Sequence, residues 1–190
     1  MRPAYGAEEI GIFGHDATIV VDVANVMGSR PDGWWRDRAG AAVRLHDQIA
    51  ELAASGRAIL PGDAEPEENA EPGENAELRE PAEPRKNAPA FVLVLEGAAR
   101  AAIPRLPSAV SSDLGDAGPS RPGEVRVVEA RGSGDDAIVA VVHELPGRRV
   151  VVTADRELRA RCAAAGAEIL RPGWLLGLLR EPQSPQAPGG

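Results

Sequence analysis

The sequence is poor in the side chains that bind soft metals or cross-link a chain. It contains one cysteine, Cys162, and three histidines. A single cysteine cannot form an internal disulfide, and Cys162 lies in a helical pattern. We therefore expect it to be a small buried residue in the reducing cytoplasm rather than a nucleophile. With so few nitrogen and sulfur ligands, a metal site in this chain would be built from oxygen, which disfavours zinc.

Long apolar runs and aromatic residues are also scarce. No run approaches the roughly 18–20 residues of a membrane span, and the N-terminus lacks the basic-then-apolar pattern of a signal peptide. We expect a cytoplasmic protein with no membrane partner. Aromatic residues make up 3% of the chain, so Val, Leu, Ile and Ala must fill the core. The 190 residues are enough for one domain with such a core.

Several familiar phosphate-handling patterns are absent. No Gly-x-x-x-x-Gly-Lys-Ser/Thr loop exists, which excludes a P-loop hydrolase. A phosphatase of the haloacid dehalogenase type needs a second acid two residues after its nucleophile, but Ala24 stands two residues after Asp22. A receiver domain needs a lysine late in the chain, and the only lysine is Lys86. The Gly-Ser-Gly at 132–134 is too short for a Rossmann phosphate loop.

Negative charge is concentrated in one segment. The formal net charge is −8, and residues 61–89, with nine acidic and three basic residues, carry most of it. This segment repeats with a six-residue period rich in Pro, Glu and Asn, which predicts a disordered insertion. The remaining sequence is nearly neutral, and its arginines occur in clusters that either bind phosphates or form a solvated surface.

Apolar β-branched runs alternate with helical patterns along the chain. This order predicts right-handed βαβ units, and hence an α/β fold: a three-layer α/β/α sandwich with a mostly parallel central sheet. The domain spans residues 17–180, between a leader at 1–16 and a disordered tail at 181–190. The predicted strands are 18–21, 91–95, 125–128, 149–153 and 168–170, and the predicted helices are 37–55, 134–144, 155–165 and 172–179.

Aspartates stand where several of these elements meet one edge of the sheet. Asp22 follows the first strand, and Asp155 follows the fourth by one residue. Asp135 and Asp136 lie in the first turn of the helix after the third strand, where acids are also ordinary caps. Because carboxyl ends of parallel strands share an edge, we expect these carboxylates to gather around cations. Oxygen ligands favour Mg²⁺ or Mn²⁺, and two such ions suit phosphodiester hydrolysis.

Three short motifs contain these aspartates. They are an aspartate followed three residues later by asparagine, an aspartate-bearing helix start, and a closing Thr-x-Asp-x-x-Leu. In chain order they read Val20-Val-Asp22-Val-Ala-Asn25-Val, Asp135-Asp136-Ala-Ile138-Val-Ala and Thr153-Ala-Asp155-Arg-Glu-Leu158. Together they resemble the motifs of the NYN family of PIN-like nuclease domains, its bacterial branch in particular.

The resemblance implies a metal-dependent ribonuclease that acts on RNA. Its metal-binding and catalytic carboxylates would be Asp22, Asp135 or Asp136, and Asp155. Further polar side chains are expected to contact the metal or the substrate, namely Asn25, Glu96, Thr153 and Arg156. The acidic segment at 61–89 departs from the family pattern.

Two other functions remain open at this stage. One is a PIN-like module that binds RNA or a protein without cutting, which is favoured if Asp22 or Asp155 forms a salt bridge with Arg149 or Arg156. The other is a nucleotide pyrophosphohydrolase, although its usual acid-rich helical motifs are missing. A homodimer is also an open alternative. Trp34 and Trp35 stack on bases or pack against the body of the domain, and the second reading is preferred.

Overall fold

The computed structural model describes residues 17–58, 60–62, 88–107, 110–111 and 121–180. The predicted leader, the predicted tail and most of the predicted insertion (63–87) lie outside these residues. No helix among the described residues combines the length and the apolar character needed to cross a membrane.

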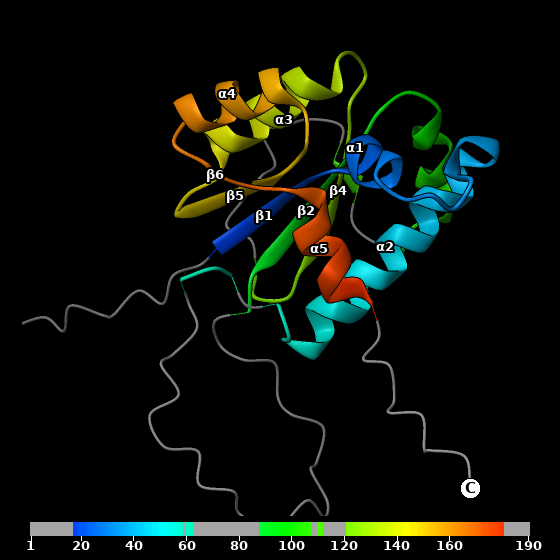
Figure 1. The fold of residues 1–190 in the computed structure, drawn as a ribbon, viewed down its shortest axis with the longest axis horizontal. Helices are drawn as coiled ribbons and strands as arrows, with labels where there is room; N and C mark the ends of the chain where they lie inside the picture. The colour runs from blue at the N-terminus through cyan, green and yellow to red at the C-terminus, as the bar shows by residue number, and fades with distance from the viewer. Residues whose placement is uncertain (1–16, 59, 63–87, 108–109, 112–120, 181–190) are drawn as a thin grey trace, which may run out of the picture.

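All the strands of the described chain belong to one parallel sheet (Figure 1). Its order is β3-β4-β2-β1-β5-β6, so β1 lies in the middle between β2 and β5. The predicted parallel α/β sheet is confirmed, and β3 is an addition because a two-residue strand leaves no pattern to recognise. The strands are β1 (Ala17–Asp22), β2 (Ala90–Leu95), β3 (Val110–Ser111), β4 (Val125–Glu129), β5 (Arg148–Val152) and β6 (Glu168–Leu170).

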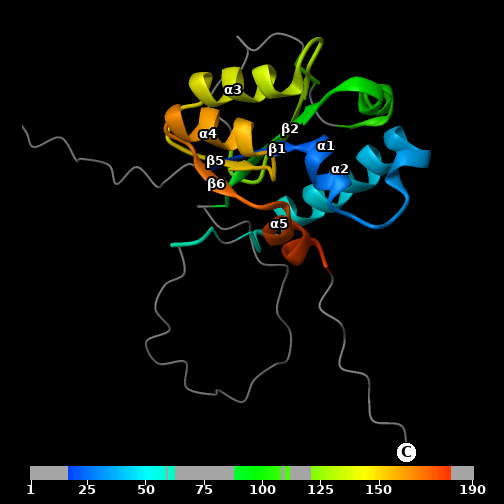
Figure 2. The same cartoon turned by 45° about the horizontal axis from the view of Figure 1, so that its top comes forward.

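Helices cover both faces of this sheet and complete three layers (Figure 2). Alternate residues of β1 face opposite sides, so Ile19 and Val21 pack with α1, α2 and α5, whereas Val20 packs with α3 and α4. Burial on both sides explains why the strands read as unbroken apolar runs. The helices are α1 (Val23–Gly28), α2 (Arg38–Ser55), α3 (Gly134–Glu144), α4 (Arg156–Ala164) and α5 (Pro172–Leu179).

The predicted helices are present at the expected positions, and backbone caps mark the ends of α2. Asp37 caps the start of α2 by accepting from Gly40 N at 2.8 Å, and Gly56 ends it with a left-handed φ of 61°. Leu45, Ile49 and Leu52 all face the core, as their spacing predicts. Cys162 is buried in the cluster under α4, also as expected.

Three segments for which the sequence predicted no helix are helical. Residues 23–28 form α1 immediately after β1, because Asp22 caps it while Val23, Val26 and Met27 bury their side chains. Six residues are too few for a helical period to show in the sequence. After β2, a 3₁₀-helix covers Gly97–Arg105. A second 3₁₀-helix, Trp34–Arg36, precedes α2.

One arginine ties the far edge of the sheet to the segment after α2. Arg148, at the start of β5, makes a forked pair with Glu168 of β6, at 2.8 and 2.9 Å. Its Nη2 also donates to the carbonyl oxygen of Pro61 at 2.9 Å. The contact fixes Pro61 at the amino ends of the strands.

The topology places a crevice at the carboxyl end of β1. The chain leaves β1 through α1 and α2 on one face of the sheet, and it reaches β5, on the other side of β1, through α3 on the opposite face. Where neighbouring connections diverge in this way, the loops separate and leave room for a ligand beyond the strand ends. The predicted acidic residues lie at this point.

Candidate active site

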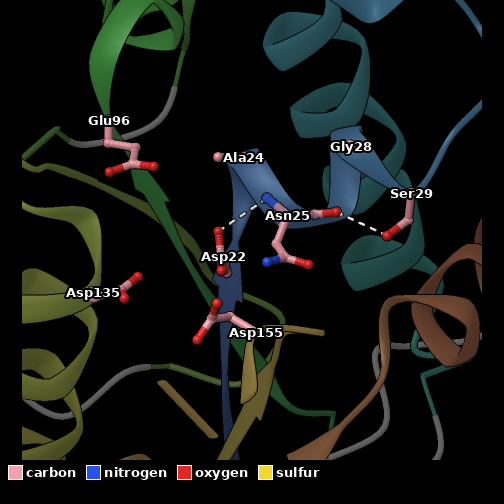
Figure 3. A pocket seen from close by; sticks show the side chains of 8 residues that line it. All are labelled: Asp22, Ala24, Asn25, Gly28, Ser29, Glu96, Asp135 and Asp155. Atoms are coloured by element: carbon pink, nitrogen blue, oxygen red, sulfur yellow. Dashed lines mark hydrogen bonds between the residues drawn. The ribbon is translucent and has the colours of Figure 1, made fainter. Parts of the chain in front are cut away.

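An open cavity of about 500 Å³ occupies this crevice. Figure 3 shows four carboxyl groups around it, each supplied by a different part of the fold. They come from the end of β1, the residue after β2, the first turn of α3 and the start of α4. The lining residues are Asp22, Ala24, Asn25, Gly28, Ser29, Glu96, Asp135 and Asp155. Sequence reasoning missed Ala24, Gly28 and Ser29, because it did not foresee α1.

Asp22 is held rigidly at the base of the cavity. It is 8% exposed, and both carboxylate oxygens accept hydrogen bonds. Oδ1 accepts from the backbone N–H of Asn25 at 3.0 Å, and Oδ2 accepts from the Thr153 hydroxyl at 2.9 Å. Burial nevertheless raises the pKa of Asp22 above its usual value, against these two bonds, and the nearby charges of Asp135 and Glu96 add to the rise.

Side-chain hydrogen bonds of Thr153 and Asn25 connect the end of β1 and the start of α1 to the loop after β5. Thr153 is completely buried, and its hydroxyl oxygen accepts from the backbone N–H of Asp155 at 3.1 Å while its proton bonds to Asp22. The Asn25 side-chain oxygen accepts from the N–H of Ala154 at 3.1 Å. The Asp-x-x-Asn spacing thus has a local cause. Asn25, the third residue of α1, donates its backbone N–H to its N-cap Asp22, and its side chain accepts from the loop that carries Asp155.

Only one of the two carboxylate oxygens of Asp155 is used in a hydrogen bond within the described residues. It is the N-cap of α4, with Oδ1 accepting from the N–H of Leu158 at 2.8 Å. The side chain also lines the cavity, and in Figure 3 it projects toward Asp22. Asp155 can therefore cap α4 and bind a ligand at the same time, since Oδ1 caps the helix and Oδ2 remains for a ligand.

Glu96 joins the site through the start of α3. Its Oε2 accepts from the backbone N–H of Gly134 at 2.9 Å, where the positive end of the helix dipole favours a carboxylate. Gly134 permits this approach, because a Cβ built on it would lie 2.7 Å from Cδ of Glu96. The small residue before Asp135 therefore makes room for the fourth acid.

Gly134→Ala is expected to displace the Glu96 carboxyl group without unfolding the protein. The added methyl group meets the end of a flexible side chain, and alanine suits a helix start, so the melting temperature should change by about 2 °C or less. Affinity for Mn²⁺, measured by titration calorimetry, should fall several-fold. Gly132→Ala is the matched control, because nothing lies within 4 Å of its Cβ position. Equal metal affinities in the two variants would contradict the role of Glu96.

The structure separates the two aspartates of α3. Asp135 lines the cavity, whereas Asp136 points away and pairs with Arg161 of α4 at 2.6 Å. Burial raises the pKa of Asp135, and the charges of Asp155 and Glu96 raise it further, while Arg161 partly offsets the rise. Asp136 thus has a structural partner outside the cavity, and Asp135 is the better candidate ligand.

Asp135→Asn is expected to stabilise the protein at neutral pH. A carboxyl group whose pKa is raised by folding makes the folded state less stable when it ionises. The loss of stability caused by ionisation of Asp135 is absent at a pH below its usual pKa of 3.8, and it is complete at a pH above the raised pKa of the folded state. The melting temperature should rise by about 1–3 °C at pH 7 in low salt, and the gain should shrink as pH falls toward 4.

The matched control for this variant is Asp136→Asn. It removes an exposed ion pair with Arg161 and should leave stability unchanged or slightly lower. Thermal melts of both variants across the pH range make the comparison. A melting temperature for Asp135→Asn that falls at pH 7 would show that its carboxylate is stabilising instead.

Arg156 lies apart from the other predicted site residues. It is an exposed residue at the start of α4 and does not line the cavity. Among the residues that the structure describes, no ion pair joins Asp22, Glu96, Asp135 or Asp155 to a cationic side chain. The salt bridges with Arg149 or Arg156 that would favour a binding module are thus absent from this part of the chain.

The donor chemistry of the cavity fits a hard divalent cation. All its charged groups are carboxylates. Burial, and to a smaller extent the charges of the neighbouring carboxylates, raises the pKa values of Asp22 and Asp135, and a bound cation would offset both effects. Within the described ranges, no three acidic, histidine or cysteine side chains converge closely enough to enclose an ion as they stand. Mg²⁺ commonly uses one or two carboxylates with water and substrate phosphate, which this arrangement can supply.

Comparisons with protein-family models, with curated proteins and with solved structures give no match to this chain. The case for its function therefore depends on the geometry of the cavity and on the chemistry of its residues.

Proposed function

We propose that the protein is a metal-dependent ribonuclease that hydrolyses RNA at the acidic cavity. The observation that carries the proposal is that the cavity brings together Asp22, Glu96, Asp135 and Asp155, and that no cationic side chain among the described residues forms an ion pair with any of them. Carboxylates that repel one another lower stability, so a function must favour keeping them together. The three motifs that resemble the NYN family contribute all of these acids except Glu96.

Mg²⁺ or Mn²⁺ bound here would supply positive charge to activate water and to stabilise the leaving oxygen of a phosphodiester. Asp22 and Asp155, braced by Thr153, would hold one side of such an ion, and Asp135 and Glu96 the other. The two hydrogen bonds on Asp22 fix its orientation before substrate arrives, which limits reorganisation during the reaction. Asn25 would orient the loop that carries Asp155 instead of contacting the metal directly.

The test is cleavage of labelled RNA by the purified chain. Mn²⁺ or Mg²⁺ should give defined products, and EDTA should stop the reaction. Single-stranded DNA of the same sequence and a nucleoside triphosphate serve as competing substrates. Release of pyrophosphate from the triphosphate, with intact RNA, would replace the proposal by nucleotide pyrophosphohydrolysis.

A second candidate is a PIN-like module that binds RNA without cutting it. The observation that favours it is the lack of three convergent ligands in the described residues. This module would bind RNA equally well with EDTA and would leave it intact. A ribonuclease would instead lose its activity on chelation, so one assay separates the two candidates.

A further inference from the structure

The side chain of Trp35 is exposed to solvent and contacts that of Trp34. At 57% exposed, it is the one large hydrophobic residue that stands out on the surface of the described part of the chain. Its ring meets that of Trp34 edge-on, with centroids 6.4 Å apart and planes at 86°. Trp34 in turn packs against the core cluster of α1 and α2. The prediction that both tryptophans pack inward is therefore wrong for Trp35.

This tryptophan pair adjoins the acidic cavity. Gly28 lines the cavity, and a Cβ built on it would lie 3.7 Å from Cζ2 of Trp34. The contacts thus run from the cavity wall through Gly28 and Trp34 to Trp35. Gly28 ends α1 and Trp34 begins the 3₁₀-helix before α2, so the two elements hold these positions together.

An exposed arginine lies close to each of the two indole rings. The Arg36 guanidinium lies 6.0 Å from the Trp35 ring centroid, and that of Arg38 lies 5.4 Å from the Trp34 centroid. Neither arginine pairs with an acidic residue in the described ranges. A cavity with four carboxylates repels a polyanion, so productive binding requires positive charge close beside it. Arg36 and Arg38 provide that charge.

We propose that Trp35, with Arg36 and Arg38, forms a stacking site for a nucleobase of single-stranded RNA that enters the acidic cavity. The base lies on the exposed indole, and the two guanidinium groups contact the phosphates on either side. The site is sequence-tolerant, because every base offers a flat face, and it selects unpaired RNA, because a paired base cannot reach the ring. The substrate class rests on the proposed function, so binding is measured apart from cleavage.

The experiment measures the binding of a short fluorescein-labelled single-stranded RNA to the full chain carrying Asp22→Asn, with Mn²⁺ present. Adding Trp35→Ala should weaken binding by about 5- to 150-fold, since stacking contributes roughly 1–3 kcal/mol per base. Trp35→Phe should recover most of the affinity, whereas Trp35→Leu should not. Equal affinity with and without Trp35→Ala, or recovery by leucine, overturns the proposal.

Two further arms make the test specific. In the first, an abasic substitution at one position of the RNA should weaken binding to the chain that keeps Trp35 but not to Trp35→Ala. If no position of the RNA gives this difference between the two chains, base stacking on Trp35 is wrong.

The second tests the arginines. Arg36→Gln should reduce the salt dependence of binding, unlike Arg57→Gln. Arg57 lies beyond the other end of the 18-residue α2, a helix about 27 Å long, and its Nε donates to the Ser55 hydroxyl oxygen. Equal effects of the two arginine variants also overturn the proposal.

The outcomes distinguish the two proposals. If the wild-type chain cleaves RNA and Trp35→Ala does so with unchanged affinity, the stacking site fails and the ribonuclease stands. If the wild-type chain binds single-stranded RNA through Trp35 but never cleaves it, the ribonuclease fails and the stacking site stands. Equal loss of affinity for duplex RNA in Trp35→Ala would show a role other than base stacking.

Discussion

Asp22→Asn is expected to lower the rate of metal-dependent RNA cleavage by on the order of 10³-fold. The substitution removes the central negative charge of the cavity but keeps the shape of the side chain. Its oxygen can still accept from the N–H of Asn25, and its amide can donate to the Thr153 hydroxyl oxygen, which rotates its proton elsewhere. Because burial raises the pKa of Asp22, the neutral variant should be no less stable than the wild type.

The controls for this variant come from the same acidic set. Asp155→Asn should cause a comparable loss, since Asp155 lines the same cavity. Asp136→Asn should retain activity within a few-fold, because Asp136 turns to Arg161. Initial rates on labelled RNA and thermal melts of each variant make the measurement. Full activity of both Asp22→Asn and Asp155→Asn, in preparations free of contaminating nuclease, would contradict the proposed mechanism.

Mn²⁺ or Mg²⁺ is expected to raise the melting temperature by about 5–10 °C at a concentration near one hundred times the dissociation constant. Binding at that ratio contributes about 2.7 kcal/mol to the folded state, and each kcal/mol shifts the melting of a domain this size by about 2–4 °C. The gain has two sources, the new ligand bonds and the relief of repulsion among the carboxylates. Differential scanning fluorimetry measures it.

The shift should depend on pH with a definite sign. The pKa values of Asp22 and Asp135 are raised, so a larger share of these groups is protonated at pH 5 than an ordinary aspartate would be. A proton competes with the cation for the same oxygens, so the shift should be larger at pH 8 than at pH 5. An equal shift in the Asp22→Asn, Asp155→Asn double variant would place the metal elsewhere.

The order of strands and helices was predictable because each buried strand carries an unbroken apolar run and each long helix has a clear cap. Asp37, Gly56 and Pro172 mark helix ends through backbone chemistry that acts locally. A parallel sheet then follows from alternation alone, and with it the edge where Asp22 and Asp155 meet. These inferences need no knowledge of distant contacts.

The remaining features depend on contacts between residues far apart in the chain. Asp135 and Asp136 differ because Arg161, which lies 25 residues after Asp136, donates a hydrogen bond to the exposed carboxylate of Asp136. The part played by Glu96 depends on a hydrogen bond to Gly134 across 38 residues. Arg156 resembled a phosphate ligand because it adjoins Asp155 in sequence, yet consecutive residues at a helix start project in different directions.

The anchoring of Pro61 by Arg148 also bears on how this protein can change over evolution. Pro61 and the beginning of β2 at Ala90 both lie where the strands begin, whereas the carboxylates lie where they end. The described residues on either side of the intervening stretch therefore lie at the end of the sheet opposite the acidic cavity. Changes in the length of that stretch are expected to leave the positions of the cavity's carboxylates unchanged.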